Sequence, residues 1–192
     1  MTRAAALTRL GLAAGPMLAL LTSCAEAAPV AVAPGRVLPV YQGPAVALFD
    51  DGIEPQPANA GFEPGASPAD NRLLRERTEL GDCVVRARIV TVTSTQGEAG
   101  ASWLIGLHAL ETLAGELPAG TDWTVRVSDG GAAAGVLRSL EGRLIDRPFI
   151  AFLREFSPAG GGGGRELHFH LAGEDGDQLG AVRTAALLAQ VK

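Results

Sequence analysis

The chain has 192 residues, which is enough for one domain and a tail but short for two domains. Its 47% apolar and 19% charged residues suit a folded core and exclude a largely disordered chain. The formal net charge is −5, and it becomes −7 without residues 1–23, whose only charges are Arg3 and Arg9. An acidic chain without a stripe of Lys and Arg disfavours nucleic-acid binding.

Residues 1–23 have the features of an export leader. Arg3 and Arg9 give a basic start with no acid, and an apolar stretch follows from Leu10 to Leu21. A run of this length is typical of secretory signal peptides, whereas a membrane-spanning helix needs about 20 apolar residues. We therefore expect export and removal of the leader.

The leader ends in Leu21-Thr22-Ser23-Cys24, which resembles the lipobox of bacterial lipoproteins. The resemblance implies cleavage before Cys24, acylation of this cysteine and attachment to a membrane. Two or three acyl chains anchor a protein stably, whereas one chain binds a membrane only weakly. Ala25 next to the cysteine is similar to the default for transfer to the outer membrane. The sequence thus predicts an outer-membrane lipoprotein that faces the periplasm or the cell surface.

A second cleavage pattern leads to a different location. Ala25-Glu26-Ala27 before Ala28 fits ordinary signal-peptide cleavage, which would discard Cys24 and release a soluble periplasmic or secreted protein. With either cut, Cys83 is left as the single free thiol, so no disulfide is expected within the mature chain. Its place in an apolar strand pattern predicts a small buried hydrophobe.

Residues 24–66 are rich in Ala, Pro and Gly and predict an extended spacer between the membrane and a globular domain over 67–192. One segment of the spacer, 44–49, is apolar enough to add to the domain as an edge strand. At the start of the domain, Ser67-Pro68-Ala69-Asp70 predicts a helix with a capping serine and an early proline, and Gly81 can end this helix.

The rest of the domain alternates as strands do. Strands are predicted over 82–93, 102–110, 123–128, 136–141 (the weakest pattern), 149–156 and 167–171, with a glycine loop over 160–164. Trp103 and Trp123 fall on apolar strand faces and are expected in the core. The acids of Glu174-Asp175-Gly176-Asp177 lack the spacing of a calcium loop and instead predict the start of a C-terminal helix.

Five or six short strands between two helices predict a mainly β (α+β) domain, a small antiparallel barrel or sandwich. The region 84–156 resembles the netrin-like, OB-type barrels in three features. It has a Val-rich first strand, an apolar second strand leading to Leu113-Ala114-Gly115, and the late strand Phe149-Ile150-Ala151-Phe152-Leu153. Metalloproteinase inhibitors of that class use a disulfide-framed N-terminal cysteine, which this chain lacks, so no functional residue is carried over.

His168 and His170 are the candidate metal ligands. Residues two apart on a strand share a face, so both imidazoles could bind one Zn²⁺ or Cu²⁺, with His108 or Glu155 as a third ligand. The same alternation places the two histidines opposite Leu167, Phe169 and Leu171, on a face expected to be exposed to solvent. The solvent-face interpretation is favoured, and no metal or cofactor is expected.

Arg86, Arg88 and Arg126, with Arg154, fall on strand positions beside core residues and could form a basic patch for a partner or an anionic polymer. The alternative is a solvated sheet face with cross-strand pairs to acids. The sequence contains no nucleophile elbow around Ser139.

The function predicted from the sequence is a non-enzymatic binding or scaffolding lipoprotein of the cell envelope, with an envelope protein or polymer as its partner. One alternative is a small metal-dependent envelope enzyme that uses His168 and His170. The other is a secreted inhibitor-like module, suggested by the barrel analogy.

Overall fold

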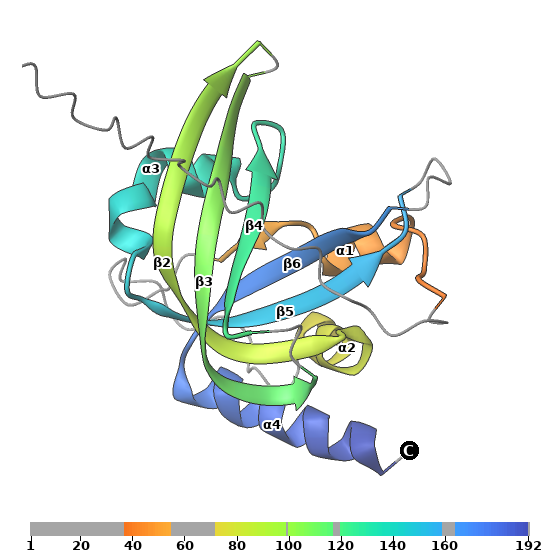
Figure 1. Cartoon of the computed structure of the whole chain (residues 1–192). Coiled ribbons are helices and arrows are strands. Elements are labelled where there is room, and N and C mark those ends of the chain that lie inside the picture. The colour runs from red at the N-terminus through yellow and green to blue at the C-terminus, as the bar shows by residue number, and fades with distance from the viewer. Residues whose placement is uncertain (1–36, 55–71, 99, 117–119, 159–163, 192) are drawn as a thin grey trace, which may run out of the picture.

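The computed structural model describes residues 37–54, 72–98, 100–116, 120–158 and 164–191. Six strands form one curled sheet in the order β1-β6-β5-β2-β3-β4 (Figure 1). The prediction of a mainly β domain, a small barrel or sandwich with helices at both ends, is confirmed as a half-barrel. The sheet is mixed rather than wholly antiparallel, because β1 runs parallel to β6.

A long hairpin forms one half of the sheet. It consists of β2 (Cys83–Gly97) and β3 (Gly100–Gly115), and β4 (Asp122–Ser128) pairs with the outer side of β3. The register between β2 and β3 shifts at three places, and such bulges bend a strand. Figure 1 shows the consequence: the hairpin curves, so that its lower part runs beside β5 while its upper part rises with β4.

The other half of the sheet consists of β5 (Pro148–Phe156), β6 (Glu166–Gly173) and the two-residue β1 (Gly52–Ile53). β5 pairs with β2 on one side and with β6 on the other, and its first residue is Pro148, one residue before the predicted start. Because β6 lies between β5 and β1, its second edge is also paired, at His170 and Leu171.

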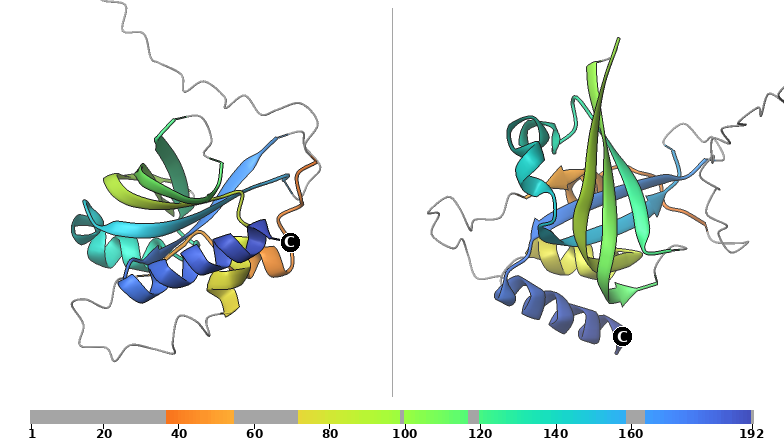
Figure 2. Two further views of the ribbon diagram at one scale, coloured as in Figure 1. Left: turned by 90° about the horizontal axis from the view of Figure 1, so that it is seen from below. Right: turned by 60° about the vertical axis from the view of Figure 1, so that its left-hand side comes forward.

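The four helices are α1 (Pro44–Leu48), α2 (Arg72–Leu80), α3 (Ala134–Leu144) and α4 (Gly176–Gln190). In the views of Figure 2, α1, α2 and α4 gather on one side of the sheet and α3 lies apart from them. The Asp175 carboxylate accepts a hydrogen bond from the backbone N–H of Gln178 at 2.7 Å, which confirms the predicted start of α4. The predicted cap of α2 lies outside the described residues, as does the loop over 160–163.

Two sequence predictions of strands were wrong, and each segment is a helix. Residues 136–141 lie within α3, whose inward residues Leu137, Leu140 and Leu144 recur at helical spacing. Residues 44–49 contain α1, which begins at Pro44; proline at the first helical position lacks only an N–H that would be unpaired there anyway. A short apolar run has no periodicity that distinguishes a strand from a helix.

The sheet separates two apolar cores. The inner core fills the half-barrel and includes both tryptophans and one face of α3; its largest members are Ile89, Trp103, Ile105, Leu107, Trp123, Leu137, Phe149, Leu153, Phe169 and Leu171. The outer core lies between the convex side of the sheet and α1, α2 and α4; it comprises Leu48, Phe49, Leu74, Val84, Ile150, Phe152, Phe156, Ala172 and Val182. As a result, the central strands are covered on both faces.

The expected spacer over 24–66 includes a folded part. Residues 37–54, which contain α1 and β1 and which we call the strap, pack against β5 and β6. Leu48 and Phe49 are buried in the outer core, and Ile53 of β1 is buried in the inner core. The strap therefore belongs to the domain. The predicted boundaries at 23/24 and 66/67 lie outside the described residues.

Candidate functional site

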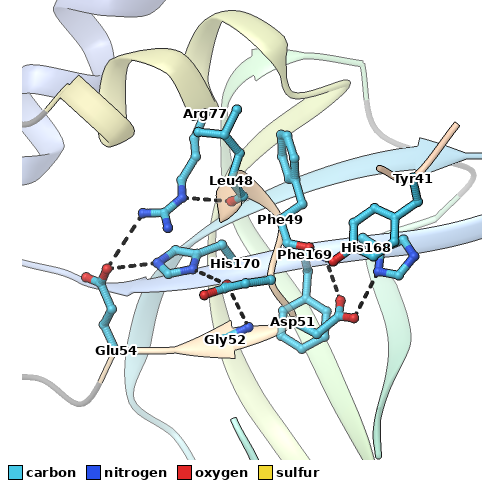
Figure 3. Close-up of polar contacts among 11 residues, drawn as sticks. Tyr41, Leu48, Phe49, Asp51, Gly52, Glu54, Arg77, His168, Phe169 and His170 are labelled. Carbon is cyan, nitrogen blue, oxygen red and sulfur yellow. Dashed lines mark hydrogen bonds and ion pairs between the residues drawn. The ribbon is translucent and has the colours of Figure 1, made fainter. Parts of the chain in front are cut away.

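The backbone of the strap bonds to the sheet at both of its ends. Near its start, the Pro39 carbonyl accepts a hydrogen bond from the Ser157 N–H at 2.8 Å. Near its end, β1 pairs in parallel with β6, and the Glu54 N–H donates to the Leu171 carbonyl at 2.8 Å. These bonds place the segment 50–54, which contains three acids, beside the two histidines of β6 (Figure 3).

His170 is held between two carboxylates of the strap. Its Nδ1 lies 2.8 Å from Oδ1 of Asp50, and its Nε2 lies 2.9 Å from Oε1 of Glu54. The imidazole is only 4% exposed, whereas Asp50 and Glu54 are about one-third and one-half exposed at the rim. When both carboxylates are ionised, each ring nitrogen can bond to its carboxylate only by donating a proton, so this geometry fits the doubly protonated imidazolium.

The pKa values of this group shift in agreement with that protonation state. Burial would lower the pKa of His170, but hydrogen bonds to Asp50 and Glu54 outweigh it and raise the pKa above 6.5. Burial would likewise raise the pKa of Asp50, but its hydrogen bond to His170 and the charges of His170 and Arg77 hold it below its ordinary value. The pKa of Glu54 is lowered chiefly by its hydrogen bond to His170.

Arg77 of α2 is the second cation that contacts the strap beside His170. Its Nε donates to the Leu48 carbonyl at 2.8 Å, and its Nη1 lies 3.6 Å from Oε1 of Glu54. The side chain is 5% exposed, so this guanidinium is a buried charge that the strap satisfies. Arg77 thus ties the strap to α2, in addition to the bonds between the strap and β6.

His168 forms a second contact with the strap. Its Nδ1 lies 2.9 Å from Oδ2 of Asp51, while the other oxygen of Asp51 accepts the Phe169 N–H at 3.1 Å. The ring of Tyr41 stacks on the imidazole with 3.5 Å between centroids, and its hydroxyl donates to the Phe49 carbonyl at 2.6 Å. Burial, followed by the charges of Asp51 and Asp50, raises the pKa of Tyr41 to about 12, so this hydroxyl stays protonated.

The sequence correctly predicted that the two histidines share one face of a strand. The prediction that this face is exposed to solvent was wrong. Both lie opposite Phe169 and Leu171, but their face is covered by the strap and α2 and is not exposed. Within the described residues, no three His, Cys, Asp or Glu side chains are placed to hold a metal ion. The proposed third ligand His108 lies on β3, separated from β6 by β2 and β5, and is paired with Asp122 at 2.8 Å.

The four arginines of the predicted basic patch have different neighbours in the structure. Arg86 bonds to Glu174 at 2.7 Å and stands opposite Glu111 on β3. Arg88 lies in a row with His108 and Asp122, whereas Arg126 lies opposite Leu104, further along the hairpin; Arg154 extends over the rings of Phe49 and Phe156. The pairing with an acid that the alternative predicts is therefore present at Arg86.

Cys83 is buried in the inner core, as predicted, and burial raises the pKa of its thiol to about 12. In a Cys24→Ala variant, we expect Cys83 to resist a disulfide reagent at pH 8 and to react fully in urea, because the thiolate is the reactive form. Absorbance of the released thiolate follows the reaction. Rapid modification of the folded chain would contradict this prediction.

Sequence reasoning missed the partners of the histidines: Tyr41, Asp50, Asp51, Glu54 and Arg77. Prolines on both sides of the strap led to its interpretation as a spacer. A signal was nevertheless present, since Asp50 and Asp51 are adjacent acids directly after an apolar run, which is unusual for a spacer of Ala, Pro and Gly.

The described residues include no helix with the length and apolar character needed to cross a membrane. Comparison of the chain with protein-family models, with curated proteins and with solved structures found no match.

Proposed function

We propose that this protein is an exported lipoprotein of the cell envelope, anchored through lipid on Cys24, whose domain has a non-enzymatic binding or scaffolding role. The leader and the sequence Leu21-Thr22-Ser23-Cys24 support export and anchoring. The observation that carries the role of the domain is the contact between the strap and β6. It occupies both nitrogens of His170 and one nitrogen of His168 in holding the domain together.

The position of the strap supports this role. The strap is the first described segment after Cys24, and its backbone is hydrogen-bonded to the sheet from Pro39 onward. Twelve residues (25–36) lie between Cys24 and Val37, so the domain would stay within about 45 Å of the anchored cysteine even with this link fully extended. A folded module on so short a link is suited to meet envelope proteins or polymers near the membrane.

Mass spectrometry of the mature N-terminus tests the anchoring. We expect the wild-type chain to begin at Cys24 with acyl groups attached and to fractionate with membranes. Cys24→Ala should abolish acylation, and the matched variant Cys83→Ala should keep it, because Cys83 lies inside the domain. An unmodified mature chain that begins at Ala28 would instead establish the soluble periplasmic or secreted protein.

Two outcomes would favour the other functions. Stoichiometric Zn²⁺ binding by the wild-type protein, lost in His168→Ala, would favour the metal-dependent enzyme over the binding module. Recovery of an envelope protease with the soluble domain, and inhibition of that protease, would favour the inhibitor-like module.

A further inference from the structure

Four ionisable side chains meet where the strap, β6 and α2 join. Asp50 and Glu54 come from the strap, His170 from β6 and Arg77 from α2. When the two carboxylates and both cations are ionised, the charges of the group sum to zero. Loss of the proton from His170 leaves one nitrogen lone pair facing a carboxylate oxygen at less than 3 Å and leaves a net negative charge in a largely buried place.

We propose that the strap is a pH-dependent latch: charged His170 holds it on the outer side of β5 and β6, and the strap is released when the imidazole loses its proton at alkaline pH. The latch itself is independent of the lipid anchor. Its use, to uncover a face for a partner, rests on the function proposed above.

The groups around His170 come from every element packed on it. The strap contributes Asp50 and Glu54, and α2 contributes Arg77. β5 contributes the uncharged ring of Phe152, 6.4 Å away between centroids. On β6 itself, His168 shares the face of His170, but it bonds to a different strap carboxylate, that of Asp51.

The direction of the pH dependence follows from the two kinds of group. The pKa of His170 is raised in the folded chain. Its contribution to the free energy that holds the strap on the sheet is therefore complete below about pH 6.5, and it is lost as the pH rises to the higher pKa of the folded chain. The pKa values of Asp50 and Glu54 are lowered, so their contribution is complete above about 4.5 and is lost only in stronger acid. The latch is therefore closed in mildly acidic medium and opens on the alkaline side.

Release of the strap would uncover apolar surface on the sheet. Leu48 and Phe49 of the strap belong to the outer core, where they pack with Val84, Phe152 and Phe156. Withdrawal of the strap also frees β6 from its pairing with β1. An exposed strand edge next to an apolar face is suited to receive an extended segment of a partner protein.

Hydrogen exchange of the full chain, measured by mass spectrometry from pH 5 to 9 and corrected for intrinsic rates, tests the latch. We expect the protection of strap peptides to be constant near pH 5–6. Between about pH 6.5 and the raised pKa of His170 in the folded chain, it should fall about tenfold for each pH unit, as a one-proton step requires, and it should level off above that pKa. Peptides of β2 to β5 should keep their protection. Strap protection that is independent of pH, or that falls together with that of the barrel, would overturn the proposal.

Variants assign the effect to one histidine. His170→Gln should give low strap protection at every pH, while the matched variant His168→Gln should keep the alkaline transition. Glu54→Gln removes an acceptor at the half-exposed rim and should move the transition to lower pH, which keeps the test valid if His170→Gln does not fold. A transition that persists in His170→Gln, disappears in His168→Gln or keeps its midpoint in Glu54→Gln would refute the latch. None of these results depends on acylation of Cys24, which the N-terminal mass reports separately.

Discussion

Replacing His170 with alanine is expected to lower the free energy of unfolding at pH 6 by about 2–3 kcal/mol. The substitution leaves Asp50 and Glu54 without the donor that each faces, and it leaves Arg77 as the remaining cation of the group. Removal of one partner of a fully buried ion pair costs about 3–5 kcal/mol, and the value here is smaller because the two carboxylates are partly exposed. Urea unfolding followed by circular dichroism measures the change.

His108→Ala is the matched control for this prediction. His108 also bonds to an aspartate at 2.8 Å, but this residue, Asp122 of β4, is 71% exposed. An exposed pair contributes at most about 1 kcal/mol, so this variant should stay close to the wild type. Equal losses in the free energy of unfolding for His170→Ala and His108→Ala would show that burial under the strap does not strengthen the contacts of His170.

Replacing Phe169 with alanine is expected to have the largest effect of any change in β6, a loss of about 3–5 kcal/mol in the free energy of unfolding. Phe169 is fully buried in the inner core, between two histidines that point to the opposite side of the strand. The loss combines the transfer of the ring to water with the cavity that remains. Fluorescence of Trp103 and Trp123, both in the same core, follows unfolding in urea.

Leu104→Ala provides the comparison, because Leu104 is a large apolar residue of β3 that is 37% exposed. Its truncation should cost less than about 1 kcal/mol. A loss of that size for Phe169→Ala as well would mean that the ring does not fill the half-barrel.

Much of the sheet was predictable from the sequence because each strand has at least one face in the inner core. In β4, Trp123, Val125 and Val127 alternate with exposed residues, and this period of two is visible in the sequence. The acidic start of α4 and the proline at the start of β5 were likewise local signals. These features depend only on neighbours along the chain.

The candidate site could not be predicted, because it depends on what covers the second face of β6. The alternation of Leu167, His168, Phe169 and His170 correctly separates two faces, but no local pattern shows that the strap and α2 lie over the histidines. The same limitation applies to α1 and β1, which were assigned to the spacer because of its prolines. The burial of His170 depends on residues 116 and 120 positions away in the chain.

This separation has a consequence for synthesis and export. The strap precedes its partners on β6 by 116 to 120 residues, so the contacts with His168 and His170 cannot form until the intervening strands have been synthesised. Contacts between residues so far apart in the chain form slowly. We therefore expect the strap to dock after β6 has formed, and in the exported lipoprotein proposed above this docking would follow transport across the membrane.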